Sequence, residues 1–279
     1  MRFSIITVSY NPGEKLRGTL RSVAAQSFTD YEVIVKDGGS TDGSTDFLKG
    51  SEEGLNHVHF YEEKDRGIYD AMNRAVGYAE GEYVLFLNCG DLLANENVLE
   101  RVNEVIERTE RDGAKACKEQ DRPKYVFYGD TFSEQTKVTI ASAPEITGFT
   151  CYRNIPCHQS CFYDIELCRE KPYDLSYKIR ADYDHFLWCF YRADARFIHM
   201  DFPVSSYEGG GYSESKENGK RDAQEHRQIT GTYMKKTELF RYRAIMALTL
   251  APVRRKMAES KAFSGLYHRL KGVLYKGKD

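Results

Sequence analysis

Residues 3–8 read FSIITV, and residues 31–35 and 83–87 read YEVIV and YVLFL. Each segment is short, apolar and rich in β-branched or aromatic residues, which is typical of a strand buried in a sheet. Between them, apolar residues recur at helical spacing over residues 16–24 and 68–79. Strands that alternate with single helices form right-handed crossovers. The sequence therefore predicts an α/β fold with a mostly parallel central sheet flanked by helices.

The rest of the chain continues this pattern less regularly. Residues 58–61 read as another strand, and Gly81 is expected to close the preceding helix, because glycine often follows a helix C-terminus. Further elements are expected as follows: helices at residues 98–106 and 182–191, strands at residues 125–128 and 196–200, and a polar surface loop at residues 111–122.

The charges are distributed unevenly along the chain. The 279 residues carry 40 Lys+Arg against 42 Asp+Glu, a net charge of −2, which excludes a generally basic nucleic-acid-binding protein. Residues 241–279 nevertheless hold ten Lys or Arg and two Asp or Glu, which leaves 30 and 40 in residues 1–240. The sequence therefore predicts an acidic body and a cationic tail that meets an anionic surface.

The lack of a recognisable signal segment and the number of cysteines lead us to expect a cytoplasmic protein. The N-terminal segment has no apolar signal region, and the longest nearly apolar stretch, residues 244–253, is too short to span a bilayer. Seven cysteines, an odd number, read as reduced thiols. Zinc is not expected, because the following residues lack paired C-x-x-C spacing: Cys157, His158, Cys161 and Cys168.

A polar or acidic cluster follows each of the first four predicted strands: Asn11, residues 37–42, Glu63 with Asp65, and residues 88–91. Ligands of open α/β sheets bind beyond the carboxyl ends of the strands, so the clusters are expected to meet in one crevice. The alternative is that these are ordinary turn residues. The crevice lacks glycine-rich phosphate loops, and carboxylates repel phosphate unless a divalent cation lies between them. A nucleotide diphosphate bound through a metal fits this chemistry.

Four ordered motifs resemble the family 2 inverting glycosyltransferases of the GT-A fold. They are IITVSYN at residues 5–11, VKDGGSTDGS at 35–44, EKDRGIYDAMN at 63–73 and LNCGD at 87–91. The last two look like the branch of the family that builds bacterial polysaccharides. The resemblance returns at three places further along: residues 158–159, 181–184 and 210–213.

The resemblance implies a donor site in the first half of the chain. The donor nucleotide would be bound by Thr7, Ser9, Asn11, Asp37, Gly39, Asp65, Arg66, Asn73 and Asn88. Within this set, Asp37 would accept hydrogen bonds from uracil or ribose. Residues 88–91 occupy the place of the family's D-x-D motif, but Asn88 replaces its first Asp and Gly90 its second. Asp91 is therefore the carboxylate that remains to bind Mn²⁺ or Mg²⁺. One or two carboxylates together with substrate phosphates can hold such a cation.

The resemblance also implies that Asp182 is the general base, although Ala181 replaces the Glu that precedes it in the family. The alternative is that Asp182 caps the helix that begins there. The acceptor or diphosphate would contact His158, Gln159, Gly210 and Ser213. Residues 209–213 read as a hinge for a loop that folds over the donor.

These expectations define an inverting glycosyltransferase that uses a nucleotide-diphosphate sugar, UDP-linked by resemblance, in bacterial surface polysaccharide synthesis. Its acceptor would be a glycan or a polyprenyl-diphosphate-linked sugar. One alternative is a catalytically degenerate nucleotide-sugar-binding protein. Another is a nucleotidyltransferase, which would need a Gly/Arg-rich phosphate loop after the first strand, and SYNPG at residues 9–13 is not one.

The chain is expected to divide into a catalytic domain, residues 1–238, and a basic amphipathic helical tail, residues 239–279. Within the domain, residues 1–92 would bind the nucleotide and residues 93–238 the acceptor. The tail carries two apolar stripes flanked by Lys and Arg: Leu239, Tyr242, Ile245, Met246 and Leu250, then Phe263, Leu266, Tyr267, Leu270 and Leu274. Such helices bind anionic lipid, so residues 241–279 are expected at the inner face of the cytoplasmic membrane. The alternative is a helix packed on the domain with its basic side chains outward.

Overall fold

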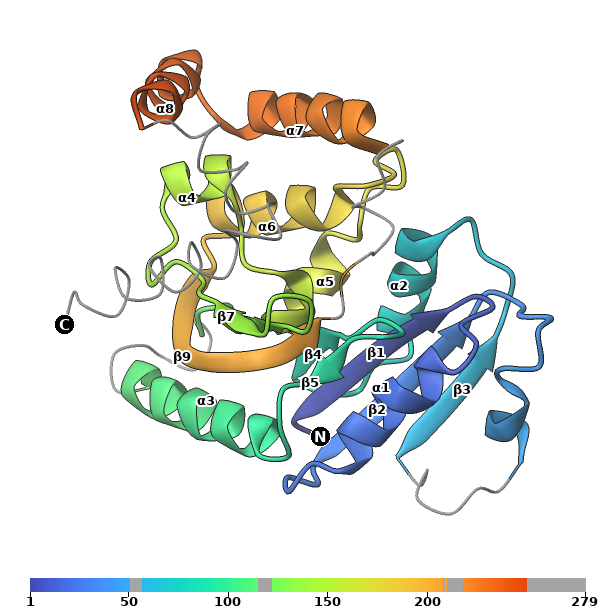
Figure 1. The fold of residues 1–279 in the computed structure, drawn as a ribbon. Coiled ribbons are helices and arrows are strands. Elements are labelled where there is room, and N and C mark those ends of the chain that lie inside the picture. Colours follow the sequence, from blue (N-terminus) through green and yellow to red (C-terminus); the bar gives the residue numbers. More distant parts are fainter. Residues whose placement is uncertain (51–56, 115–121, 208, 210–217, 250–279) are drawn as a thin grey trace.

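The computed structural model describes residues 1–50, 57–114, 122–207, 209 and 218–249. The described strands form one nine-stranded sheet in the order β3-β2-β1-β4-β8-β6-β9-β5, with β7 paired to β6 (Figure 1). The first half of the chain supplies four parallel strands: β1 (Phe3–Ser9), β2 (Tyr31–Asp37), β3 (Val58–Glu62) and β4 (Tyr83–Phe86). Every residue of β1, β2 and β4 is buried, which explains why these segments read as continuous apolar runs.

The second half extends the same sheet with a mixed set of strands. The bounds are β5 (Leu92–Leu93), β6 (Tyr125–Ser133), β7 (Val138–Ile140), β8 (Cys161–Asp164) and β9 (Arg196–Tyr207). Strand β8 runs antiparallel to both β4 and β6, and so joins the two halves of the chain. Strands β6 and β9 are longer than predicted because they pair in parallel along their length, with register shifts next to Asp130.

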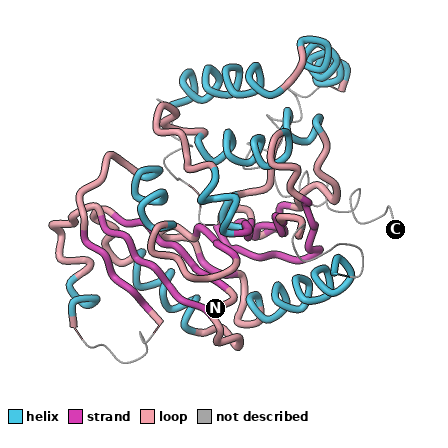
Figure 2. Tube along the Cα trace, turned by 180° about the vertical axis from the view of Figure 1, so that it is seen from behind, coloured by secondary structure: helices cyan, strands magenta, loops and turns pink. Residues whose placement is uncertain are grey.

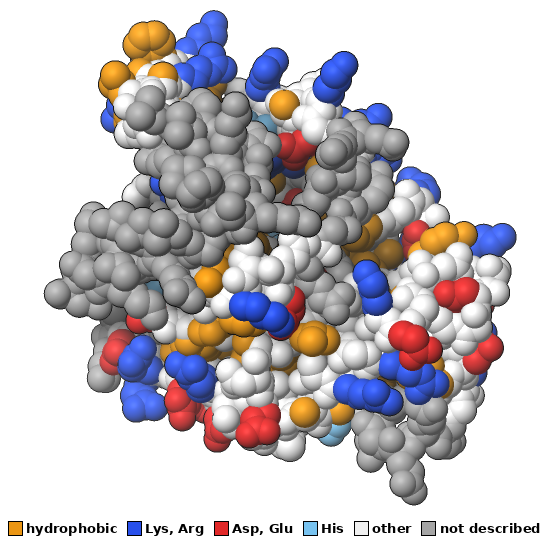
Figure 3. Space-filling model, in the orientation of Figure 1, with side chains coloured by type: hydrophobic (Ala, Val, Ile, Leu, Met, Phe, Trp, Pro, Cys, Tyr) orange, Lys and Arg blue, Asp and Glu red, His pale blue; other side chains and the backbone are white. Residues whose placement is uncertain are grey.

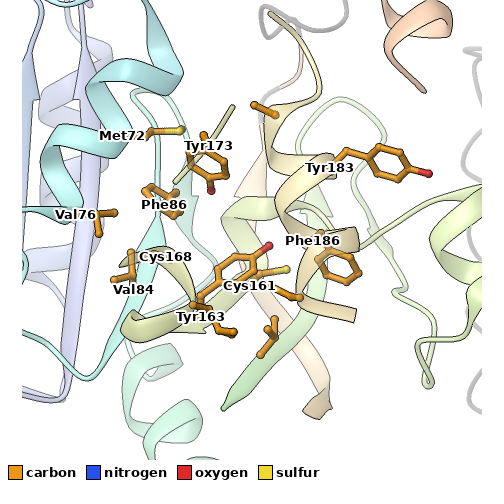
Figure 4. Close-up of a cluster of buried hydrophobic side chains, with 14 of the residues drawn as sticks. Met72, Val76, Val84, Phe86, Cys161, Tyr163, Cys168, Tyr173, Tyr183 and Phe186 are labelled. Carbon is orange, nitrogen blue, oxygen red and sulfur yellow. The ribbon is translucent and has the colours of Figure 1, made fainter. Parts of the chain in front are cut away.

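Helices cover both faces of the sheet, as the views in Figures 1 and 2 show. One face is covered by α1 (Lys15–Ala24) and α3 (Val98–Ala114), whose apolar residues pack on β1, β2 and β4. The other face carries α2 (Ile68–Val76), α5 (Ile165–Glu170) and α6 (Ala181–Tyr191), and α7 (Gly219–Tyr233) packs on α6. Figure 4 shows the core of this second face, where Met72 of α2, Phe86 of β4, Tyr163 of β8 and Phe186 of α6 lie together.

Two expectations about helix ends are wrong. Helix α2 ends at Val76 and is followed by Gly77, so Gly81 does not close it. Gly81 is needed for a different reason, since a Cβ there would lie 2.5 Å from the backbone nitrogen of Ser4. Helix α3 continues to Ala114, into the segment predicted to be a loop, while residues 115–121 lie outside the described residues.

The start of the expected tail is a helix packed on the domain. Helix α8 (Lys236–Leu248) buries Tyr242, whose ring lies 5.5 Å from the rings of both Phe149, in α4 (Gly148–Arg153), and Tyr152. The packed-helix alternative is therefore correct for this side of α8. The second apolar stripe, residues 263–274, lies outside the described residues. None of the described helices is both long and apolar enough to cross a membrane.

Candidate donor and catalytic site

The polar clusters that follow the parallel strands lie close together at the carboxyl edge of the sheet. Asn11, after β1, has a left-handed backbone conformation with φ of 47°. Its N–H donates to Ser40 Oγ at 2.7 Å, and its Oδ1 accepts from the Thr41 N–H at 2.8 Å. Asn11 thereby joins the loop after β1 to the loop after β2.

Asp37, the last residue of β2, organises the loop that follows it. The buried carboxylate accepts hydrogen bonds from Ser9 Oγ at 2.7 Å, from the Gly39 N–H at 2.9 Å, and from both N–H and Oγ of Ser40 at 2.7 and 2.6 Å. Burial raises the pKa of Asp37, but the hydrogen bonds outweigh it and the net pKa lies below its ordinary value. Four bonds fill the acceptor sites of a carboxylate. Its predicted contact with uracil or ribose therefore requires one of these donors to turn away.

Asp65, also predicted at the nucleotide, is paired with a buried lysine. Lys36 Nζ is fully buried and lies 2.8 Å from Asp65 Oδ2, and it also donates to the backbone carbonyls of Asp37 and Glu63. Sequence reasoning assigned no role to Lys36. The available signal was a lysine at the end of a mostly apolar strand segment, because a buried lysine needs an acidic partner.

Other predicted donor residues lie behind the site and hold it together. Thr7 Oγ1 donates to the Leu87 carbonyl at 2.8 Å. Both ends of the Asn73 amide bind the backbone of Tyr173, at 2.8 and 2.9 Å, and so join α2 to the second half of the chain. Arg66 has a side chain that is 74% exposed and pairs with Asp70 at 2.9 Å. That pairing, opposed by partial burial, lowers the pKa of Asp70 to about 2.

Asp182, the predicted base, lies in the first turn of α6 and faces two partners from other elements. Tyr69 of α2 donates from its hydroxyl to Asp182 Oδ1 at 3.0 Å and to the Ile179 carbonyl at 2.6 Å. His158, in the short 3-10 turn η3 (His158–Ser160), places Nδ1 3.6 Å from Asp182 Oδ2. The N-cap of α6 is Arg180, so the helix-cap alternative for Asp182 is not what the structure shows.

These contacts keep Asp182 ionised. Burial raises the pKa of Asp182, but the interaction with His158 and the hydrogen bond from Tyr69 lower it, and the net pKa lies below the ordinary value. Burial lowers the pKa of His158, while the Asp182 carboxylate raises it, and the net pKa lies above the ordinary value. An anionic carboxylate can accept a proton at neutral pH, which is what a general base requires.

His158 links this carboxylate to the loop at residues 88–91. Asn88 Nδ2 lies 3.1 Å from His158 Nε2, so in the neutral tautomer in which Nε2 accepts from this amide, Nδ1–H faces Asp182. Asn88 Oδ1 is buried and has no hydrogen-bond partner among the described residues. Rotation of the amide would present Oδ1 to a protonated Nε2, so Asn88 can accommodate both charge states of the histidine.

The loop at residues 88–91 is a tight turn in which the Asp91 N–H donates to the Asn88 carbonyl at 3.0 Å. Asp91 is buried, and Gly90 has φ of 97°. Within the described part of the chain, no three His, Cys, Asp or Glu side chains converge on a point that could hold a metal. With one carboxylate in this loop, a divalent cation held there would need donor phosphates and water as its other ligands. The role of Asp91 as a metal ligand stays a prediction.

The remaining predicted site residues come from the second half. Gln159 is buried beside His158, and its contact with an acceptor stays a prediction. Gly210 and Ser213 lie outside the described residues, as does most of the predicted hinge. Tyr69 was not singled out from the sequence, because its partner Asp182 is 113 residues away.

Four parallel strands with polar loops at their carboxyl edge are consistent with the class of GT-A-type glycosyltransferases. The chain belongs to glycosyl transferase family 2, whose family model matches residues 4–158. A PGL/p-HBAD biosynthesis glycosyltransferase of Mycobacterium bovis is 34% identical over 214 residues, which are 76% of this chain and 78% of that protein. The protein is therefore a family 2 glycosyltransferase with a GT-A fold.

Two solved structures support the fold. Residues 1–349 of S. aureus TarS, in complex with UDP-GlcNAc, match with a TM-score of 0.63 and 22% identity over 82% of this chain and 66% of that one. This chain covers 37% of the longer TarS structure. The mannosyltransferase PcManGT of Pyrobaculum calidifontis, in complex with GDP-Man and Mn²⁺, matches with a TM-score of 0.55 and 16% identity over 100% of this chain and 88% of that one.

Proposed function

We propose that the protein is an inverting glycosyltransferase that moves a sugar from a UDP-linked donor to a glycan or polyprenyl-diphosphate-linked acceptor in bacterial surface polysaccharide synthesis. The observation that carries this proposal is the position of Asp182, which accepts a hydrogen bond from Tyr69 and lies beside His158, itself in contact with Asn88. In this proposal residues 1–92 bind the donor and residues 93–238 bind the acceptor.

The proposed reaction is a single displacement. Asp182 accepts the proton of an acceptor hydroxyl while the hydroxyl oxygen attacks the anomeric carbon from the face opposite the nucleotide. The bond between that carbon and the diphosphate oxygen breaks, and its electron pair leaves with the nucleoside diphosphate. An α-linked donor therefore gives a β-linked product. A divalent cation between Asp91 and the diphosphate remains part of the proposal by resemblance, and no step is derived through it.

The donor can be tested by thermal shift with UDP-sugars and GDP-sugars, each with Mn²⁺ and with EDTA. A ligand at 100 times its Kd stabilises the folded state by about 2.7 kcal/mol. For a chain of this size that raises Tm by roughly 5 to 10 °C. We expect UDP-sugars to give this rise and GDP-sugars a smaller one. If neither class raises Tm, the chain has no nucleotide-sugar site and the proposal is wrong.

We also propose that one face of α8 binds the anionic inner surface of the cytoplasmic membrane. Phe240 and Leu248 are 77% and 83% exposed, and Ala244 and Ala247 lie between them at helical spacing. Figure 3 shows apolar and basic side chains next to each other on this helix. The exposed basic residues of the helix are Lys236, Arg241 and Arg243. Exposed apolar side chains flanked by cations suit an anionic lipid surface.

Changing Phe240 and Leu248 together to Glu tests this surface. Each apolar side chain contributes roughly 1.5 to 3 kcal/mol when buried, so the double variant should lose at least 100-fold in vesicle binding. The measurement is sedimentation with vesicles of phosphatidylglycerol, with phosphatidylcholine vesicles for comparison. Deleting residues 241–279 is a poorer test, because it removes Tyr242 from its buried contacts.

The matched control changes Gln224 and Gln228, two exposed residues of α7, to Glu. This control alters the net charge by the same amount and should sediment like the wild-type protein. Wild-type protein that stays in the supernatant, or a Phe240/Leu248 variant that sediments as well as wild type, would show that α8 does not bind the membrane.

A further inference from the structure

The loop at residues 88–91 is fixed against the first turns of α1. The Gly90 N–H donates to Thr19 Oγ1 at 3.0 Å, and the Asn88 carbonyl lies 3.5 Å from the same oxygen. Thr19 Oγ1 also lies 3.3 Å from the carbonyl of Lys15, the first residue of α1. The first turn of α1 and the loop in the D-x-D position therefore form one unit.

The side chain of Lys15 lies over Gly90. A Cβ added to Gly90 would be 3.3 Å from Lys15 Cδ and 3.9 Å from Lys15 Nζ. The positive φ of Gly90 also disfavours any other residue at this position. The aliphatic part of Lys15 thus occupies the space that a carboxylate side chain at residue 90 would enter. The Lys15 ammonium group lies nearby.

The loop and Lys15 together are consequently close to neutral, whereas a motif with two carboxylates carries two negative charges. Asn88 and Gly90 contribute no negative charge, Asp91 contributes one, and Lys15 adds a positive charge. Burial and the nearby carboxylates raise the pKa of the Cys89 thiol to about 12, and the positive charge of Lys15 acts against this increase. The charge of Lys15 therefore acts on this loop. A diphosphate needs a cation where it binds, and lysine is a common phosphate ligand in proteins.

Three other basic side chains near the site already have partners. Lys36 is buried against Asp65, and Arg66 pairs with Asp70. The guanidinium of Arg17 lies 3.8 Å above the ring of Phe47. The exposed Lys15 ammonium, in contrast, makes no hydrogen bond or ion pair with another described residue. It also extends from the N-terminal end of α1, where the helix dipole favours an anion.

We infer that Lys15 binds the donor diphosphate and takes over part of the charge neutralisation that a carboxylate-held metal would otherwise supply. This inference rests on the proposed function, because it assumes a nucleotide-diphosphate donor at the carboxyl edge of the sheet. It assigns Lys15 as a donor-binding residue that favours nucleoside diphosphates over nucleosides, even without a divalent cation.

Calorimetry with UDP and uridine, and with GDP and guanosine, tests this inference in EDTA and in Mn²⁺. Wild-type protein should bind the diphosphate more tightly than the nucleoside in EDTA. Lys15→Met should lose about 10- to 100-fold in diphosphate affinity, the range for a hydrogen bond to a charged group, while nucleoside affinity stays within twofold. Lys15→Arg should recover most of the loss. Arg21→Met, which removes a charge from an exposed residue on the same helix, should bind like wild type.

Three other results of the calorimetry would overturn either the inference about Lys15 or the proposed function. If wild-type protein binds none of the four compounds, the proposed function fails. If it binds a diphosphate and Lys15→Met binds it equally well, the inference about Lys15 is wrong and the proposed function stands. If wild-type protein prefers the diphosphate in Mn²⁺ alone, a metal provides the neutralisation and the inference is again wrong.

Discussion

Asp182→Asn is expected to lower release of the nucleoside diphosphate from the donor by about 10²- to 10⁴-fold, the range for loss of a general base. The substitution keeps the shape of the side chain, and its Oδ1 can still accept the hydrogen bond from Tyr69. An amide, however, does not take up the acceptor proton. Donor affinity, measured by calorimetry, should stay near the wild-type value, because Asp182 acts on the acceptor. Wild-type turnover in this variant would remove Asp182 as the base.

Tyr69→Phe is the companion variant that keeps the carboxylate. The hydrogen bond from Tyr69 lowers the pKa of Asp182, so its loss should raise that pKa and move the acidic limb of the kcat profile to higher pH. A merely structural role for Tyr69 would lower kcat equally at every pH. Besides burial, the groups that shift the pKa of Asp182 are His158, the backbone N–H of Tyr183 and the hydroxyl of Tyr69.

The sign of the pH dependence follows from the two shifted groups. The contribution of Asp182 to stability is present above its unfolded pKa and is lost as pH falls through its lowered folded pKa. The contribution of His158 is present below its unfolded pKa and is lost as pH rises through its raised folded pKa. The ion pair is therefore complete between the lowered pKa of Asp182 and the raised pKa of His158.

Lys36→Met is expected to destabilise the fold by about 3 to 5 kcal/mol, the usual cost of removing one partner of a buried ion pair. The lysine is fully buried, and its loss leaves the Asp65 carboxylate, 13% exposed, without its cation. Two backbone carbonyls lose a donor at the same time. Urea denaturation should show a lower midpoint with an unchanged slope.

Two further variants separate the buried pair from a general effect of lysine loss. Lys36→Met combined with Asp65→Asn should recover part of the stability, because the uncompensated charge is gone. Lys49→Met removes a lysine that lies 2.8 Å from Glu62 at the surface, with both side chains more than 40% exposed. That variant should keep the wild-type midpoint, since water and salt screen exposed pairs. Equal midpoints for Lys36→Met and the wild type would contradict the assignment.

The sequence predicted the parts of the fold that depend on local pattern. The apolar runs at β1, β2 and β4 were recognisable because every residue in them is buried, and the polar clusters followed from where those strands end. Gly81 shows the limit of a local rule, because the residue is required by its approach to Ser4 and not by a helix end.

The contacts that shape the candidate site were not predictable in this way. Tyr69 meets Asp182 across 113 residues, and Asn88 meets His158 across 70. Such pairs are created by the order of strands in the sheet, since β8 joins the two halves, and no spacing in the sequence encodes them. Lys36 lies inside a quoted motif and Lys15 lies near one. The pairing of Lys36 with Asp65 and the position of Lys15 over Gly90, however, are visible only in three dimensions.

The configuration of the released sugar shows whether Asp182 drives an inverting displacement. An α-linked UDP-sugar that binds the protein is incubated with it in water, and the anomeric proton of the product is followed by NMR before mutarotation. We expect the β-anomer to form first, with one UDP per sugar released, and Asp182→Asn to form neither product at an appreciable rate. If the α-anomer forms first, the displacement is not inverting.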